Sequence, residues 1–197
     1  MTRDAPAFRQ MTDASLLEAA AAGSQAAFAE IVSRYFQPVY RLVWRLTGGA
    51  ADAEDIAQDA FVKLWKNPSQ IREGAALKGW LMRVASNAVI DGSRKPRAAA
   101  LADAPEPQDP QARPDAPLDR AQAARLVDAM IAALPERQRL ALSLVYFEGL
   151  SNIEAAAVME VSIEAVESLL ARARRSLKES LSAEWRDLIG GLAETGR

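Results

Sequence analysis

A proline-rich segment in the middle of the chain constrains the fold more than any other feature. Each proline removes a backbone donor and biases the preceding residue away from the helical region. A structureless loop of this length is uncommon inside a compact domain, so we interpret the segment as an acidic, semi-extended linker between two domains. The alternative is a long loop within one domain. The prolines are Pro96, Pro105, Pro107, Pro110, Pro114 and Pro117.

Both sides of this segment show the periodicity of amphipathic helices. In the N-terminal half, apolar residues follow the three–four spacing of a helical face over 28–46, 53–65 and 77–89. We expect these faces to form the core. No alternating strand pattern occurs in the sequence, so the predicted fold is all-α, with two small helical domains. The C-terminal half contains helical patterns over 118–134, 135–149, 151–159 and 162–181, and the tail from Glu184 to Arg197 predicts a short extra helix.

The composition narrows the classes of function. The 197 residues include neither cysteine nor histidine, which excludes disulfides, thiolate zinc sites and the side chain most often used as a general base. There is no glycine-rich phosphate loop or nucleophile elbow either. We therefore expect no enzyme activity, no metal, no cofactor and no small-molecule substrate.

Charge and hydropathy indicate where the protein acts. The net charge is −2, so any nucleic-acid surface must arise from local clustering of basic residues. No apolar run approaches the roughly 20 residues that span a bilayer, and the first residues lack the apolar core of a secretory signal. The predicted location is the cytoplasm, without membrane insertion.

The last two predicted helices have the pattern of a helix-turn-helix. Ser151 and Ser162 stand at N-cap positions, and Glu154 completes a capping box with Ser151. The second helix turns Val166, Leu170 and further apolar residues to one face. Its other surface favours DNA binding, although an αα-hairpin with a solvated charged face fits the pattern about as well. The exposed polar residues are Ser168, Arg172, Arg174, Arg175 and Lys178.

Two helices of the N-terminal half carry further candidate surfaces. Gln58 and Asp59 lie beyond the first turn of their helix, where the dipole does not explain them, and they suggest a partner surface. A solvated face is the simpler alternative. Asn87 has poor helix propensity in mid-helix, which indicates either hydrogen bonding in the core or contact with a nucleobase.

These motifs, taken in order, resemble an extracytoplasmic-function (ECF, group IV) sigma factor of bacterial RNA polymerase. AEDIAQDAFVKLW resembles the family's core-polymerase-binding segment, and GWLMRVASNAVIDGSR resembles its promoter-melting segment. The stretch from LPERQRLALSL to EAVESLLARARRSL resembles its second DNA-binding domain. The similarity extends from about Asp13 to Leu181.

The resemblance implies a division of the chain. Residues 10–95 would form sigma region 2, residues 96–117 the linker, residues 118–183 sigma region 4, and residues 184–197 a C-terminal extension. Extended at roughly 3.1 Å per residue, the linker spans about 68 Å. Together with two domains of roughly 13 Å radius, it reaches promoter elements about 85 Å apart.

The resemblance also implies partners and their binding residues. The partners would be core RNA polymerase, promoter DNA and an anti-sigma factor that restrains activity at stress-type promoters. Core polymerase would bind Asp55, Gln58, Asp59, Phe61 and Trp65. The −10 element would bind Ser69, Gln70, Arg83, Ser86, Asn87, Arg94 and Lys95. The −35 element would bind Ser162, Glu164, Ala165, Glu167, Ser168, Arg172, Arg174 and Arg175.

The predicted recognition helix departs from the family pattern. Glu167 and Leu169 stand where relatives carry basic residues, and Glu160 occupies a turn position where relatives often have glycine. Glu167 can accept a hydrogen bond from a cytosine amino group, but it repels phosphates. The weak basic character of this helix favours an alternative function, in which the protein mimics a sigma factor and titrates its regulators.

Overall fold

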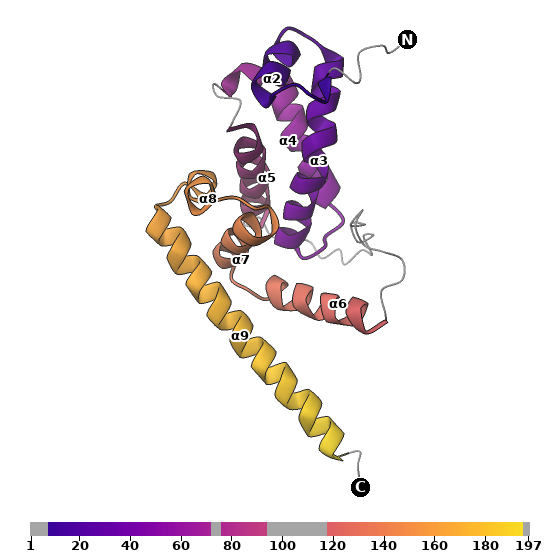
Figure 1. The fold of residues 1–197 in the computed structure, drawn as a ribbon, viewed down its shortest axis with the longest axis vertical. Coiled ribbons are helices and arrows are strands. Elements are labelled where there is room, and N and C mark those ends of the chain that lie inside the picture. Colours follow the sequence, from indigo (N-terminus) through magenta and orange to yellow (C-terminus); the bar gives the residue numbers. More distant parts are fainter. Residues whose placement is uncertain (1–7, 72–75, 94–117, 195–197) are drawn as a thin grey trace. The chain divides into compact units, whose positions relative to one another are not determined.

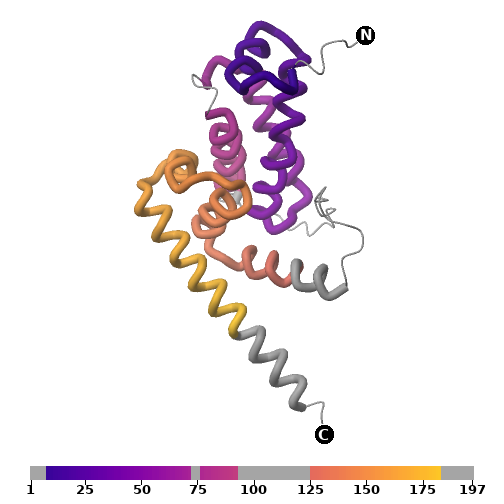
Figure 2. The backbone as a smooth tube through the Cα atoms, viewed as in Figure 1, coloured from indigo at the N-terminus to yellow at the C-terminus, as the bar shows by residue number. Residues whose placement is uncertain are grey.

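The computed structural model describes residues 8–71, 76–93 and 118–194, with side chains placed in 8–71, 76–92 and 125–182 (Figures 1 and 2). Every secondary-structure element in these ranges is helical, which confirms the all-α prediction. Most of the chain on either side of residue 107 forms a compact unit of its own, and each unit is described by itself. The linker, residues 96–117, lies outside the described residues. Within the described ranges, none of the helices combines the length and apolarity that crossing a lipid bilayer requires.

The first unit is built around one long helix, α3, which packs against α2, α4 and α5. The fully buried side chains at its centre include Leu16, Ile31, Leu42, Leu64 and Leu81. Burial of each such side chain contributes roughly 1.5–3 kcal/mol. The elements are α2 (Asp13–Ala21), α3 (Gln25–Thr47), α4 (Ala53–Lys66), the 3-10 turn η1 (Pro68–Gln70) and α5 (Leu77–Ser93).

Local signals set both ends of α3. The Ser24 hydroxyl accepts a hydrogen bond from the backbone N–H of Ala27 at 3.2 Å, as an N-cap does. Gly48 ends the helix in the left-handed conformation with φ 67°, which costs a glycine little. Between these ends, the helix continues through Pro38.

A polar cluster fastens α2 to α3. The Arg34 guanidinium donates to Asp13 at 3.1 Å and to Glu30 at 2.9 Å, and it also donates to the carbonyls of Phe8 and Arg9. The Tyr35 hydroxyl donates to the other oxygen of Asp13. Burial raises the pKa of Tyr35 well above its ordinary value, and the hydrogen bond to Asp13 adds to the shift. Asp13 thus serves two donors on α3 and fixes how the two helices pack.

The second unit packs α7 and α6 against α9. Its elements are α6 (Leu118–Ala132), α7 (Glu136–Leu142), the π-helical turn η3 (Ser143–Phe147), α8 (Asn152–Met159) and α9 (Ile163–Glu194). The helix predicted over 135–149 is therefore α-helical only in its first part. The core cluster consists of Ile131, Leu134, Leu142 and Ala173, with Leu177 packed against it.

The last helix is longer than predicted. The sequence pattern predicted a separate short helix from Glu184, but α9 continues without a break from Ile163 to Glu194. The prediction of a break was wrong because neither proline nor glycine occurs between Leu177 and Ile189 to interrupt the backbone hydrogen bonds.

Candidate protein-binding and nucleic-acid-binding surfaces

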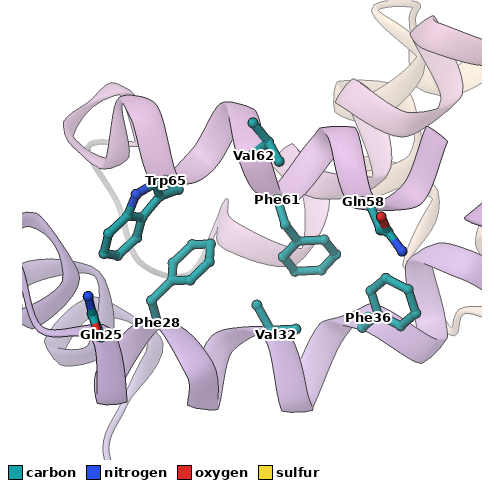
Figure 3. A pocket seen from close by; sticks show the side chains of 8 residues that line it. All are labelled: Gln25, Phe28, Val32, Phe36, Gln58, Phe61, Val62 and Trp65. Atoms are coloured by element: carbon teal, nitrogen blue, oxygen red, sulfur yellow. The ribbon is translucent and has the colours of Figure 1, made fainter. Parts of the chain in front are cut away.

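An apolar groove runs between α3 and α4 on the surface of the first unit. Its volume is about 470 Å³. The groove is open to solvent although its walls are mostly apolar, and none of its lining residues is charged. Figure 3 shows Phe28, Val32 and Phe36 of α3 facing the side chains of α4 across it. The lining consists of Gln25, Phe28, Val32, Phe36, Gln58, Phe61, Val62 and Trp65.

Aromatic contacts hold the two walls of this groove together. The Phe28 and Trp65 rings meet edge to face, with centroids 4.8 Å apart, and the Phe36 and Phe61 rings lie 5.9 Å apart. Such pairs stabilise by about 0.5–1.5 kcal/mol beyond their burial. Trp65 nevertheless remains 41% exposed and Val62 45% exposed. The groove therefore presents large apolar area that the first unit does not cover.

The structure divides the five residues predicted to bind core polymerase. Gln58, Phe61 and Trp65 line the groove. Asp55 and Asp59 are exposed on α4 but do not line it. The Gln58 amide donates to Glu54 at 3.1 Å, which orients Gln58 at one end of the groove.

The α3 wall of the groove was not predicted. Phe28, Val32 and Phe36 fit the helical periodicity that was assigned to the core, but each is only partly buried. One sequence signal could have identified this wall, namely the width of the apolar stripe on α3. Apolar side chains occur on so many positions between Phe28 and Leu46 that they exceed a single core-facing stripe of about 100°.

The described residues that were predicted to bind the −10 element lie on two elements, η1 and α5. Ser69 and Gln70 are exposed in η1, where the Ser69 hydroxyl donates to Asn67 at 3.0 Å. Arg83 and Asn87 lie one turn apart on α5. Asn87 is exposed, which excludes the alternative that it satisfies polar atoms in the core. Ten helical residues, about 15 Å, separate the start of α5 from Asn87.

The remaining residues predicted to bind the −10 element are Ser86, Arg94 and Lys95. Ser86 is 1% exposed, and its hydroxyl donates to the carbonyl of Arg83 at 3.1 Å. It is not accessible to DNA in this structure, so its assignment as a DNA contact is wrong. Arg94 and Lys95 lie outside the described residues.

The helix-turn-helix caps form as the sequence predicts. The backbone N–H of Ser151 donates to Glu154 at 2.7 Å, and the N–H of Glu154 donates back to the Ser151 hydroxyl at 3.2 Å. Ser162 accepts from the N–H of Ala165 at 3.2 Å. Between the two helices, Glu160 adopts φ 53°, a left-handed conformation that favours glycine. The turn thus keeps its backbone geometry although glycine is absent.

The outer surface of α9 carries the residues predicted to bind the −35 element. Val166, Leu170 and Ala173 are buried, so the opposite surface faces away from the core of the second unit. Ala165 is partly buried. A backbone hydrogen bond lowers the pKa of Glu164, and the Ser162 hydroxyl adds to the shift. The exposed residues on this surface are Ser162, Glu164, Glu167, Ser168, Arg172, Arg174 and Arg175.

The two units expose surfaces of different chemistry. Within the described ranges, no three acidic side chains lie close enough together to hold a metal ion. The first unit offers an apolar groove, and the second offers a helix on which two exposed glutamates precede a cluster of exposed arginines. Both are surfaces on which a macromolecule can bind.

Comparison with protein families gives two matches, one in each unit. The family model for Sigma-70 region 2 matches residues 31–99, which contain most of α3, α4 and α5. The model for Sigma-70, region 4 matches residues 124–177, which contain the helix-turn-helix.

Relatives with known names match almost the whole chain. The RNA polymerase sigma-H factor of Pseudomonas aeruginosa is 32% identical over 184 residues, which cover 87% of this chain and 95% of the relative. The ECF RNA polymerase sigma-E factor of Escherichia coli K12 is 32% identical over 181 residues, covering 85% and 93%. The ECF RNA polymerase sigma factor SigW of Bacillus subtilis is 28% identical over 177 residues, covering 81% and 91%.

Solved structures also resemble this chain. The structure of CnrH in complex with the cytosolic domain of CnrY matches with a TM-score of 0.67 and 28% identity, covering 87% of this chain and 97% of that one. The sigma factor RpoE of Bartonella quintana, crystallised with the anti-sigma factor NepR, matches with a TM-score of 0.65. At 22% identity over 79% of this chain and 96% of that one, the second match supports the fold alone.

Proposed function

Because the chain belongs to the ECF sigma factors of bacterial RNA polymerase, we propose that it binds core polymerase through the α3–α4 groove and directs it to a dedicated set of promoters. Sigma factors regulate transcription initiation. In this proposal the protein contributes binding surfaces and no catalytic group, and the polymerase performs the chemistry. It acts in the cytoplasm, where polymerase and promoter DNA are found.

The groove is the observation that carries the polymerase-binding proposal. It lies within the region 2 match, and its lining contains three of the residues that the family resemblance assigns to polymerase binding. The groove is open to solvent and lined mostly by apolar side chains, as is the surface that binds an amphipathic helix in helix-in-groove recognition. Exposed Trp65 and Val62 supply the large apolar contacts that dominate such interfaces.

A charge placed in the groove tests this proposal. Val62→Glu puts a carboxylate where a bound helix would remove it from water, so we expect retention of core polymerase on the immobilised protein to fall at least tenfold. Gln37→Glu adds the same charge at an exposed position of α3 outside the groove, and it should bind as the wild type does. Equal retention by the two variants would contradict the placement.

Strand separation at the −10 element is assigned to α5. Asn87 is exposed in mid-helix, beside Arg83 on the same face, and can hydrogen-bond an unpaired base. We expect Asn87→Ala to reduce promoter opening, measured by permanganate reactivity of unpaired thymines, without weakening polymerase binding. Normal promoter opening by this variant would show that Asn87 is not the residue that captures the unpaired base.

The upstream element is assigned to α9. The capped helix-turn-helix and the exposed Arg172, Arg174 and Arg175 support this assignment, because helices of this kind insert their first turns into the major groove and contact phosphates farther along. Run-off transcription with purified core polymerase on fragmented genomic DNA tests the whole function. Failure to initiate would favour a sigma mimic that titrates regulators.

An anti-sigma factor is the regulatory partner that we infer. The similar solved structure of CnrH holds a second protein, the cytosolic domain of CnrY, and the family resemblance implies an anti-sigma factor as such a partner. The exposed apolar groove suits such a partner as well as it suits polymerase, so the two would compete. Addition of the anti-sigma factor should then release the protein from core polymerase.

A further inference from the structure

Glu167 is an acidic residue on the outer surface of α9 that the fold does not explain. Glu164 has a structural role, since the backbone and Ser162 hydrogen-bond it at the start of the helix. Glu167 lies beyond the first turn and is exposed, and no hydrogen bond or ion pair involves it in the described part of the chain. Its carboxylate is therefore free to contact a ligand.

The charges on α9 are ordered along the helix. Both exposed carboxylates of its first half, those of Glu164 and Glu167, precede the arginines at 172, 174 and 175. With a rise of 1.5 Å per residue, Glu167 and Arg172 are about 7.5 Å apart along the axis. In a helix that enters the major groove with its N-terminal end, the first turns meet base edges and the later basic residues meet phosphates. This order places Glu167 at the bases and away from the phosphates.

We propose that Glu167 selects a cytosine in the upstream promoter element by accepting a hydrogen bond from its N4 amino group. The inference rests on the proposed binding of promoter DNA by α9. In the major groove, the edge of cytosine presents a donor, whereas guanine presents two acceptors and thymine one. Adenine places its N7 acceptor beside its amino donor. A carboxylate is therefore repelled least by cytosine.

The test is selection from a promoter library with randomised upstream elements, using the full chain bound to core polymerase. The wild type should enrich cytosine at one position by about 10- to 100-fold over the other bases. Glu167→Gln should change the preference at that position to adenine, because the amide of glutamine pairs with N6 and N7. Glu167→Arg should change it to guanine.

A matched variant controls for charge. Glu179→Gln removes the same charge from an exposed position of α9 three turns farther along, and it should keep the wild-type preference at every position. If the Glu167 variants also keep that preference, Glu167 is a solvated surface residue and the inference is wrong, while DNA binding by α9 stands. If the wild-type holoenzyme selects no upstream sequence, the proposed function of α9 itself fails.

Discussion

The groove of the first unit and the outer surface of α9 are two exposed surfaces of opposite construction. The groove is lined by uncharged residues of two helices, and its walls come from positions about 30 residues apart in sequence. The surface of α9 is charged and belongs to one helix, whose positions three and four apart are neighbours by geometry. One surface depends on how helices pack, whereas the other depends on the order of residues along one helix.

This difference predicts different physical behaviour. Binding in the apolar groove is driven by removal of apolar area from water, and added salt screens it little. Binding of arginines to phosphates releases counterions and weakens steeply as salt rises. The contribution of each surface can therefore be separated by its dependence on ionic strength.

The largest effect is expected from Trp65→Ala. Trp65 contacts Phe28 and still exposes two-fifths of its surface, so its loss removes both a wall of the groove and an apolar contact for a partner. We expect polymerase binding to weaken by about 2–4 kcal/mol, with the same loss at low and at moderate salt. Titration with core polymerase at two salt concentrations measures this. A loss that shrinks as salt rises would show that the groove does not act as an apolar site.

Tyr35→Phe tests the packing of α2 on α3. The folded state keeps the Tyr35 hydroxyl protonated because burial and the bond to Asp13 raise its pKa, whereas in the unfolded chain it ionises near pH 10. The stability from this group is present below about pH 10 and is lost as the pH rises further. The variant should be less stable by about 1 kcal/mol at neutral pH, and the difference should narrow above pH 10. Urea unfolding from about pH 8 to 11 measures it, and a constant difference would contradict the assignment.

Arg172→Ala tests the charged surface of α9. We expect the affinity for the upstream element to fall by about 1 kcal/mol and the slope of log affinity against log salt to fall by about 1. Fluorescence anisotropy with a labelled duplex across a salt series gives both values. An unchanged slope would show that Arg172 does not contact a phosphate. It would also weaken the expected difference in salt dependence between α9 and the groove.

The smallest effect is expected at the turn before α9. Glu160 holds a left-handed backbone that costs an L-residue roughly 1–2 kcal/mol, whereas glycine adopts it freely but loses more entropy on folding. Glu160→Gly should therefore raise the stability of the chain by about 0.5 kcal/mol, while Glu160→Ala should not. Calorimetry of the full chain compares them. Equal melting temperatures for the two variants would show that this turn is not strained.

Features that depend on residues within one segment were predicted correctly from the sequence. Ser151 and Ser162 cap helices as their spacing predicts, since a cap is a contact between residues three apart. Features that depend on the packing of two segments were not predicted correctly. Phe28, Val32 and Phe36 were assigned to the core, and Ser86 was assigned to DNA. Helical periodicity identifies an apolar or polar face, but it does not say what covers that face.

Most of the helices, the serine caps of the helix-turn-helix, the division at the proline-rich segment and the order of charges on α9 follow from the sequence alone, because each depends on residues within a few positions of one another. The packing of α3 against α4, by contrast, is what brings the α3 aromatics and the exposed side of α4 together in one groove. Which apolar side chains become buried depends on the distance and angle between helices that lie far apart in the chain. The way α5 packs against its neighbours likewise leaves Asn87 exposed and buries the adjacent Ser86.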